Sequence, residues 1–546
     1  MRVSEDPGCT VVWLRRDLRL ADNPALVEAA GADGAGVVLS LWPRMDGEVG
    51  SRRANSRATA SLVGVAPFSA PGGAGRWWLA RSLAALDDDL RQRGSRLVVR
   101  RAGAGAGGVA AAVASLADEK SARRVVWARG IDPDQQAEDQ AVRRALAQSG
   151  VEPVIVPAAG LLLAPDTVTT HQGAPYRVFT PFWRAVSAGL RPPAPLPAPM
   201  ALVAPADLPR GVSLTELERE AVRPWSAGFA DVWQPGEAGA RARLHRLLGD
   251  VLPAYAEDRD RPDLEGSSRL SPHLHFGELS ARQVWHAVAG RLAEAGLEPE
   301  AATLPPSRSE TAPGLREAVG PTAQSPQTAA TAALARGAGA FLRQLGWREF
   351  AHHLLWHFPD TVTRPLQGRF AVFPWRDDLD GLAAWQQGRT GFPLVDAAMR
   401  CLRATGWMHN RARLVAGSFL VKDLLLPWQA GAAWFRDTLV DADVANNTLG
   451  WQWVAGCGAD AAPYFRIFNP VKQGERFDPG GAFVRRWVPE LAELPTRWVQ
   501  APWAAPADVL AEAGVRLGET YPAPIVDHGE ARSRALAAYE VVKLAR

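Results

Sequence analysis

Residues 441–453, DADVANNTLGWQW, combine acidic, amide and aromatic side chains in a way that ordinary core segments do not. Asp441 and Asp443 are separated by one residue, Asn446 and Asn447 follow them, and two tryptophans end the segment. A buried carboxylate needs a cationic partner or hydrogen-bond donors, and an amide can both donate and accept. Helix N-capping is an alternative role for the two acids. The segment therefore indicates a site for a bound group with polar atoms and a large aromatic surface.

Three other stretches add side chains of similar kinds. Residues 255–280 contain SSRLSPHL, in which hydroxyl and amide groups at a turn before a helix would suit phosphate oxygens. Serine-rich helix caps are also common without a ligand. Residues 341–350 and 405–428 contribute Arg, Trp and His. Residues 336–413 hold eleven Arg and no Lys against six acids, a balance of +5 that indicates either a phosphate-rich partner or a solvated helix surface.

The histidines and cysteines do not indicate metal chemistry. His353 and His357 have the i, i+4 spacing, but no Glu follows the first of them as it does in zinc proteases. His273 and His275 have no further ligands at a zinc-site spacing. The three cysteines lie far apart, so they form neither a disulfide framework nor a cluster motif, and a reducing cytoplasm is expected.

The composition is that of a folded protein of several domains. The chain has 546 residues, of which 47% are hydrophobic and 22% charged, with a net charge of +3 and 21 tryptophans. No apolar run approaches the roughly 18 residues that a membrane helix requires. The first residues carry acids and do not have the pattern of a signal peptide.

The first third of the chain alternates between strand and helix patterns. Short β-branched runs occur at residues 11–16, 36–42, 96–101, 123–129 and 152–157. Helical patterns occur between several of them, which predicts a parallel, Rossmann-like sheet covered on both faces. The glycine-rich residues 103–108 lack the G-x-G-x-x-G spacing and predict a flexible connection.

The remainder of the chain has helical spacing of its apolar residues. Residues 190–210 are rich in Pro and predict an extended linker, and residues 298–330 predict a long surface loop. We therefore expect an α/β domain at residues 8–165, a linker at 166–235, and a larger all-α domain at 236–546.

Two long strings identify a resemblance to a known family. TGWMHNRARL (405–414) and DAAPYFRIFNP (460–470) are similar to strings of the photolyase and cryptochrome family of light-driven flavoproteins. The resemblance covers nearly the whole chain, beginning at VVWLRRDLRLADNPAL (11–26) and passing through PYRVFTPFWRA (175–185). It implies one non-covalent, U-shaped FAD per chain, held in the helical domain.

The resemblance also implies which residues bind the FAD. Positions that contact its phosphates and ribityl chain correspond to Tyr255, Ser267, Ser268, Leu270 and Ser271. Arg413 and Asp441 match a salt-bridged pair beside the isoalloxazine, and Asp443 matches a carboxylate that accepts a hydrogen bond from the ring. Asn447 matches the residue that faces flavin N5.

Side chains near the ring favour a repair enzyme over a receptor. Plant-type blue-light receptors of this family carry an acid at the position of Asn447, whereas a neutral amide is compatible with the fully reduced anionic flavin that repair requires. Enzymes that repair (6-4) photoproducts have two histidines in the 405–414 region, where this chain has Asn410 and Leu414. The resemblance therefore implies light-driven repair of cyclobutane pyrimidine dimers, that is, a deoxyribodipyrimidine photo-lyase.

The implied lesion pocket has aromatic walls and polar contacts. Trp347 and Trp453 match the walls, and the matching polar residues are Arg259, Gln344, Arg348, Asn410 and Arg411. UV-damaged DNA is the expected partner, because a damaged base pair stacks weakly and can be flipped into a cavity whose basic rim binds phosphates. We expect a monomer that does not act on membranes.

Tryptophans also match an electron path. Trp451, Trp428 and Trp375 correspond to a chain of three that reduces oxidised FAD from the surface, and core packing is the alternative for each. Trp385 is interpreted as a packing residue or a side branch.

The α/β domain resembles one that holds an antenna pigment, either a methenyltetrahydrofolate or a deazaflavin, but residues 128–132 depart from the folate-binding pattern. A cryptochrome-like photoreceptor without repair activity and a dark flavin oxidoreductase are the competing hypotheses.

Overall fold

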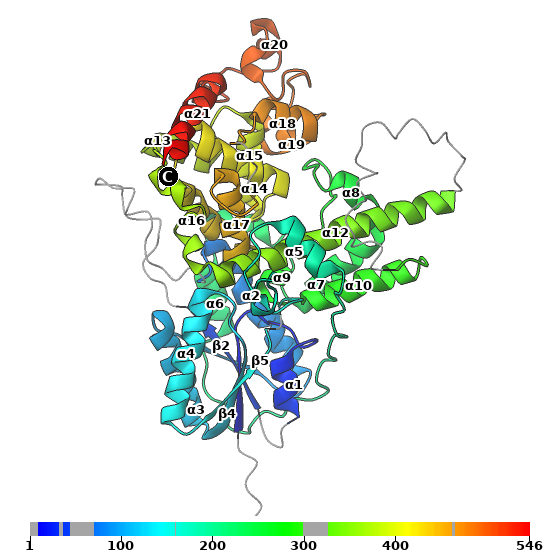
Figure 1. Ribbon diagram of the computed structural model, residues 1–546, viewed down its shortest axis with the longest axis vertical. Coiled ribbons are helices and arrows are strands. Elements are labelled where there is room, and N and C mark those ends of the chain that lie inside the picture. The colour runs from blue at the N-terminus through cyan, green and yellow to red at the C-terminus, as the bar shows by residue number, and fades with distance from the viewer. Residues whose placement is uncertain are drawn as a thin grey trace, which may run out of the picture.

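The computed structural model describes residues 9–31, 36–43, 70–158, 160–298, 326–460 and 465–545. Figure 1 shows a parallel sheet flanked by helices at one end of the molecule and a larger helical region at the other. This arrangement confirms the predicted fold class, whereas the exact domain boundaries stay predictions. Among the described residues, no helix combines the length and apolar character that a membrane crossing requires.

The sheet has five parallel strands in the order β3-β2-β1-β4-β5. Its strands are β1 (Cys9–Leu14), β2 (Gly36–Trp42), β3 (Leu97–Arg101), β4 (Ala122–Ala128) and β5 (Glu152–Val156). In the central strand β1, Val12 pairs with Val38 on one side and with Val126 on the other. The chain order reverses between β1 and β4, and at such a switch point the carboxyl ends of the strands open onto a ligand crevice.

Helices cover both faces of the sheet because successive strand residues point to opposite sides. They are α1 (Pro24–Ala30), α2 (Gly73–Arg91), α3 (Gly105–Glu119) and α4 (Pro133–Gln148). Val12 and Leu14 of β1 pack with residues of α1 and α2, whereas Val11 and Trp13 pack with residues of α3 and α4. Both faces are therefore buried, as the near-continuous apolar strands predict.

The predicted flexible connection at residues 103–108 is wrong. Gly105 begins α3, and a Cβ atom at Gly108 would lie 2.3 Å from the carbonyl carbon of Gly103. The glycines therefore serve a close approach between the incoming chain and the first turn of the helix, rather than flexibility.

The proline-rich linker lies against the α/β domain as extended chain. Backbone amides of Leu202 and Val212 donate to the carbonyl oxygens of Arg93 and Val99, at 3.0 and 2.8 Å. The linker region also contains the helices α5 (Phe179–Ser187) and α6 (Leu214–Ala221). Leu217 of α6 packs into the same core as α2.

The rest of the chain is helical, and among the described residues it adds no second sheet. Its helices are α7 (Glu237–Arg246), α8 (Tyr255–Asp258), α9 (Ser271–Phe276), α10 (Ala281–Ala293), α12 (Pro326–His357), α13 (Leu379–Gln387), α14 (Pro393–Thr405), α15 (Asn410–Ser418), α16 (Trp428–Thr438), α17 (Val444–Ala455), α18 (Pro470–Phe477), α19 (Ala482–Trp487), α20 (Ala507–Glu512) and α21 (His528–Leu544). The predicted loop at 298–330 lies mostly outside the described residues, and its last five residues already belong to α12.

The two regions are joined by buried polar contacts. The fully buried Arg19, which follows β1, donates from Nη1 to the carbonyl oxygen of Gly277 at 2.8 Å. Gly277 has φ +68°, and a Cβ atom there would lie 1.9 Å from the carbonyl oxygen of Arg16. Trp78 of α2 donates from Nε1 to Glu278 at 2.8 Å. The backbones of the α/β and helical regions are therefore in direct contact at Gly277 and Arg16.

Candidate functional site

Asp443 is a half-buried, ionised carboxylate that caps the start of α17. Its Oδ1 accepts hydrogen bonds from the backbone and side-chain nitrogens of Asn446, at 2.9 and 2.6 Å, so the N-cap role is real. Its Oδ2 faces His352 at 3.4 Å and His275 at 3.7 Å. Burial alone would raise the pKa of Asp443, but the two histidines outweigh it and hold that pKa well below its usual value. The carboxylate can therefore accept a hydrogen bond from a ligand.

Asp441 and Arg413 form the predicted ion pair. Nη2 of Arg413 lies 3.0 and 2.8 Å from the two carboxylate oxygens of Asp441, which is buried. Nε of Arg413 donates to the carbonyl oxygen of Met408 at 2.8 Å, in the turn that leads into α15. This second contact fixes the guanidinium, so the buried acid keeps a cationic partner.

Asn447 and Trp451 lie on successive turns of α17. Nδ2 of Asn447 donates to the carbonyl oxygen of Ala432 on α16 at 3.0 Å, which leaves Oδ1 as the group available to a ligand N–H. Trp451 is buried against Gly431 of α16, where a Cβ atom would lie 2.0 Å from the indole Cη2. A glycine at 431 is therefore required for the observed position of Trp451.

The loop before α9 carries the residues predicted to hold the FAD phosphates and ribityl chain. Ser267 and Ser268 are half-buried, Leu270 is buried, and the exposed Ser271 begins α9. Between them Arg269 has φ +51°, an uncommon conformation for a side chain of this size. Backbone strain of this kind clusters at ligand clamps.

Tyr255, the remaining residue of the predicted phosphate and ribityl set, is buried edge-on against Phe341 with ring centroids 5.4 Å apart. Burial raises the pKa of its phenol. The structure therefore keeps this hydroxyl protonated, as a neutral hydrogen-bonding group.

The arrangement of polar atoms fits a polar aromatic ligand. His275 Nδ1, Trp434 Nε1 and Trp451 Nε1 are buried and have no hydrogen-bond partner among the described residues. Buried polar groups without partners are rare in folded proteins, and each calls for an explanation. His275 lies 3.7 Å from Asp443, Trp451 is on the same helix as Asn447, and Trp434 is on the adjacent α16, so a flavin bound near these helices would offer them partners. Among the described residues no cluster of His, Cys, Asp or Glu could hold a metal ion.

Part of the predicted lesion pocket comes together around Asp260. Nη2 of Arg411 lies 2.7 Å from one carboxylate oxygen of Asp260, and Nε of Arg259 lies 3.9 Å from the other. Arg411 also stands 4.2 Å above the ring of Phe477. Asn410 is exposed one residue earlier. The side chains of Arg259 and Asp260, which follow α8, and of Arg411 in α15 therefore form one half-buried cluster with a net positive charge.

The two predicted aromatic walls have separate neighbours. Trp347 stacks on Phe179, with centroids 3.7 Å apart and an interplanar angle of 9°. Trp453 lies below the guanidinium of Arg466, at 5.7 Å. Both indoles and Gln344 are half-buried, so a base could reach them. Their role in binding a lesion stays a prediction.

Arg348, also assigned to the lesion pocket, contacts the backbone of two other segments. Its guanidinium donates to the carbonyl oxygens of Gly160 at 2.7 Å and Leu274 at 3.4 Å. It lines a cleft that also contains Asp443. Its predicted role in binding a lesion stays a prediction, and residues on one helix can share a motif and still face different spaces.

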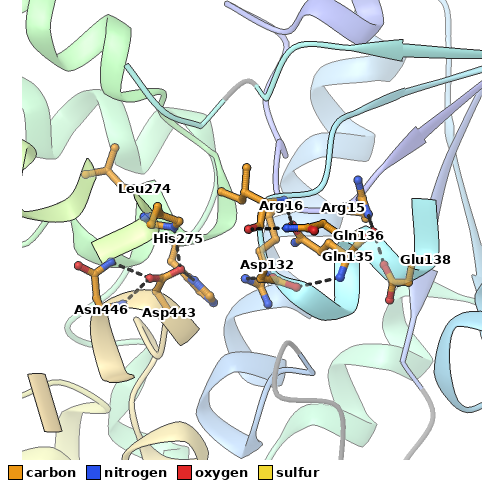
Figure 2. Close-up of polar contacts among 12 residues, drawn as sticks. Arg15, Arg16, Asp132, Gln135, Gln136, Glu138, Leu274, His275, Asp443 and Asn446 are labelled. Atoms are coloured by element: carbon orange, nitrogen blue, oxygen red, sulfur yellow. Dashed lines mark hydrogen bonds and ion pairs between the residues drawn. The ribbon is translucent and has the colours of Figure 1, made fainter. Parts of the chain in front are cut away.

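That cleft lies between the two regions and is partly open to solvent. Arg15 and Arg16 follow β1, Arg129 follows β4, and Asp132 caps α4, so the switch point of the sheet forms one wall. Figure 2 shows Arg15, Arg16 and Asp132 facing a second group, which consists of Leu274, His275, Asp443 and Asn446. Asp443 therefore lies beside both the predicted ring site and the cleft.

The charges in the cleft are largely paired. Arg16 lies 3.6 Å from Asp132, and Arg15 lies 3.4 Å from Glu138 and 2.9 Å from Asp139. Burial raises the pKa of Glu138 to about 7 despite Arg15, and burial also raises the pKa of Asp132. Oδ2 of Asp132 is buried and accepts no hydrogen bond from the described residues.

The three tryptophans of the predicted electron path share one hydrophobic cluster, and their role in electron transfer stays a prediction. Trp451 and Trp428 are buried in the largest hydrophobic cluster, and the half-buried Trp375 packs against that cluster. The backbone N–H of Arg376 donates to the carbonyl oxygen of Leu425 at 2.8 Å, which holds the Trp375 segment beside the residues that lead to Trp428.

Trp385 belongs to the same aromatic core. Its ring centroid lies 6.2 Å from that of Trp451, and its Nε1 donates to the carbonyl oxygen of Ala416 at 2.9 Å. It is fully buried, so it can pack or branch but does not reach the surface.

Sequence reasoning missed several residues of the site. His275 and His352 both contact Asp443. The sequence pattern around His275 bears only on metal binding, and the pattern around His352 indicates no partner. Gly431 and Asp260 carried no local signal, because their partners are distant in sequence. Arg15 and Arg16 follow a predicted central strand, and the rule that ligands bind at strand ends would have identified them.

Comparisons with known proteins agree with the geometry. The profile described as DNA photolyase matches residues 10–200, and the FAD binding domain of DNA photolyase matches residues 341–541. A deoxyribodipyrimidine photo-lyase of Agrobacterium fabrum is 41% identical over 534 residues, 98% of each chain. Cryptochrome-1 of Arabidopsis thaliana is 36% identical over 96% of this chain and 69% of its own length. The crystal structure of a bacterial class III photolyase from Agrobacterium tumefaciens covers 100% of this chain and 99% of its own, with a TM-score of 0.82 and 40% identity. The chain therefore belongs to the photolyase and cryptochrome family.

Proposed function

We propose that this protein uses light to split cyclobutane pyrimidine dimers in DNA, with a non-covalent FAD as its photoactive group. The observation that carries the proposal is the amide of Asn447, held by Ala432 on the helix that also carries the ionised Asp443. An amide cannot titrate, so it presents the same acceptor to a reduced ring at every working pH. Relatives named as photo-lyases extend over nearly the full chain, which supports the same conclusion.

The side chains of this site bind and orient the cofactor. When bound, a reduced FAD supplies a strong electron donor in its light-excited state. Asp443 would accept a hydrogen bond from a ring N–H, and Asn447 Oδ1 is the available acceptor on the next turn of α17. The Arg413–Asp441 pair keeps its charges balanced beside the ring without a mobile counter-ion. Trp451 and its core neighbours exclude water from that side.

The DNA partner is recognised by charge and by aromatic surface. Arg259 and Arg411 offer guanidinium groups near the surface, and phosphates would compete with Asp260 for them. Trp347 and Trp453 offer flat apolar faces to a flipped-out dimer. The dimer stacks poorly inside the duplex, so its extrusion costs little free energy. No acid–base group is needed for the bond cleavage.

A single assay tests the proposed function. Purified protein is reduced, mixed with dimer-containing DNA, and either illuminated with blue light or kept dark, with undamaged DNA and a flavin-free preparation as controls. Loss of dimers only in the illuminated sample supports repair. Photoreduction of the flavin with intact dimers would instead indicate a receptor, and NAD(P)H oxidation in the dark would indicate a reductase.

A variant at Asn447 sharpens this test. Asn447→Asp introduces a group that can lose a proton next to the ring, whereas Asn447→Gln keeps the amide and changes only its reach. We expect Asn447→Asp to lose more repair per bound flavin than Asn447→Gln. Equal losses in the two variants would show that the neutrality of this side chain is not what matters.

We also propose that the cleft at the switch point of the sheet holds an antenna pigment. Arg15, Arg16, Arg129 and Arg348 line it, and Leu274 and Leu355 add apolar surface, so an anionic pigment with apolar parts fits. A methenyltetrahydrofolate and a deazaflavin both satisfy this description. Release of the pigment by denaturation, followed by its absorption spectrum and mass, decides between them, and a preparation that contains only FAD would refute the proposal.

A further inference from the structure

His352 of α12 is a buried histidine that lies between two oxygen atoms. Its Nδ1 is 2.9 Å from the backbone carbonyl oxygen of Arg348, one turn earlier in the same helix. Its Nε2 is 3.4 Å from Oδ2 of Asp443. Neither a carbonyl group nor an ionised carboxylate can donate a proton, so both ring nitrogens face atoms that only accept hydrogen bonds.

The proton count of the ring follows from these two contacts. A neutral imidazole carries a proton on one nitrogen only, so its other nitrogen would direct a lone pair at an oxygen atom. At Nδ1 the short distance to the carbonyl oxygen requires an N–H group. At Nε2 the partner is a carboxylate that stays ionised, and an N–H group there replaces repulsion by an ion pair. Only the imidazolium, which has a proton on each nitrogen, suits both contacts.

His275, the second histidine at Asp443, does not supply this charge. Its Nδ1 lies 3.7 Å from Oδ2 of Asp443. Burial lowers the pKa of His275, and the positive charge of Arg16, which lines the same cleft, lowers it further. His275 is therefore neutral near pH 7, and the carboxylate of Asp443 depends on His352 for an opposite charge.

We infer that His352 is an imidazolium and a positioning residue of the flavin site, an inference that rests on the proposed binding of FAD beside Asp443. Without this charge, the ionised Asp443 would place a negative charge next to a reduced flavin that is itself an anion. With it, the His352–Asp443 pair is neutral, as the Arg413–Asp441 pair is. His352 should therefore favour the reduced over the oxidised flavin, and this preference should decline as the pH rises and His352 loses its second proton.

The other charges near His352 have partners of their own. Nη1 of Arg348 lies 3.5 Å from Oε1 of Glu349, whose Oε2 accepts hydrogen bonds from the backbone of residues 162 and 163. Burial raises the pKa of Glu349, which favours its uncharged form. The charged or titratable groups that line or adjoin the cleft around His352 are Arg348 and Glu349 from α12, His275 from α9, Asp443 from α17, and Arg16 and Asp132 from the sheet wall.

Nuclear magnetic resonance measures the protonation of His352 directly. Protein labelled with nitrogen-15 in its histidines and loaded with FAD is recorded at pH 7, and the signal that disappears in His352→Gln identifies the residue. We expect both ring nitrogens of His352 to carry a proton. A ring with a single N–H group at pH 7 would overturn the inference, and this measurement on the wild type holds even if a variant does not fold.

A redox titration measures the effect on the flavin. The ratio of reduced to oxidised bound FAD is recorded at fixed potentials from about pH 6 to about pH 9, a range in which histidine ordinarily loses its charge. His352→Gln should lower this ratio by about tenfold or more at the acidic end, because one nearby positive charge is lost. His352→Arg keeps a charge at every pH, so it should restore the ratio and remove the decline that the wild type adds to the proton uptake of the flavin itself. An unchanged ratio in His352→Gln, or no restoration in His352→Arg, would count against the charge.

His357 provides the matched control on the same helix. Its Nε2 lies 3.1 Å from the backbone carbonyl oxygen of Pro165 rather than near a carboxylate, so His357→Gln should leave the ratio unchanged. An equal loss in both variants would show that disturbance of α12, not charge, is the cause. Repair of dimers by the pre-reduced wild type is assayed in parallel. Absence of repair with a doubly protonated His352 would refute the proposed function alone, whereas repair with a singly protonated His352 would refute the inference alone.

Discussion

The packing of Trp451 on Gly431 gives a prediction that can be worked out from the structure. In Gly431→Ala the new Cβ would lie 2.0 Å from Cη2 of Trp451 and 2.5 Å from its Cζ2 and Cζ3 atoms. The indole cannot move aside freely, because Phe435 and Trp385 pack on it at 5.0 and 6.2 Å. Either α16 or α17 must shift.

Two effects of opposite sign decide the magnitude. Replacing glycine by alanine inside a helix stabilises by about 0.5–1 kcal/mol. Overpacking a tight core costs about 1–3 kcal/mol. The clash here is against a rigid ring, so the cost exceeds the gain, and we expect Gly431→Ala to lower the free energy of unfolding and to slow flavin photoreduction.

Gly290 of α10 provides the control. A Cβ atom there meets nothing within 4 Å, so Gly290→Ala should be neutral or stabilising. Thermal unfolding followed by the release of flavin fluorescence measures stability, and illumination of the oxidised protein measures photoreduction. A Gly431→Ala protein that is as stable as Gly290→Ala and photoreduces normally would show that the described contact between α16 and Trp451 is wrong.

Four other predictions follow from the charges and rings of the site. Trp451→Phe should slow photoreduction of oxidised FAD but leave repair by pre-reduced enzyme nearly intact, as kinetics with and without dithionite would show. Asp443→Asn should weaken FAD binding, measured by equilibrium dialysis. Because the folded pKa of Asp443 is depressed, its contribution to stability is fully present above the unfolded value of about 3.9 and is lost as the pH falls through the folded pKa, so the stability difference between the wild type and Asp443→Asn should shrink below about pH 4 in urea titrations. Glu138 has a folded pKa of about 7, above its unfolded value, so the wild type should lose stability as the pH rises from 5 to 8 relative to Glu138→Gln, which urea titrations at several pH values would detect. Arg411→Ala should remove about one phosphate contact, which would lower the slope of log K for damaged DNA against log salt concentration by about one. An unchanged slope would show that Arg411 contacts no phosphate.

The sequence predicted the sheet and the helical region because each follows from local patterning. The β-branched runs around Val12, Val38 and Val126 predict buried parallel strands, and the apolar periodicity after residue 236 predicts helices. The family strings identified Arg413 and Asp441, which the structure brings together.

Features that depend on long-range contacts could not be predicted in the same way. Arg348 belongs to the motif that contains Trp347, but its hydrogen bonds to Gly160 and Leu274 direct it into the cleft. The glycines near Gly108 were interpreted by composition alone, which cannot distinguish a flexible loop from a close approach. His352 acquires its role only from the fold, because Asp443 lies far along the chain.

The contact between Gly277 and Arg16 has a consequence for the use of light. Because the two backbones leave no space for even a methyl group, the regions cannot hinge at this point without breaking the fold. A pigment in the cleft and a flavin among the helices would then keep a fixed separation and a fixed mutual orientation. Excitation passing between them would depend on those two fixed quantities alone, and its efficiency would hardly change between a cold and a warm cell.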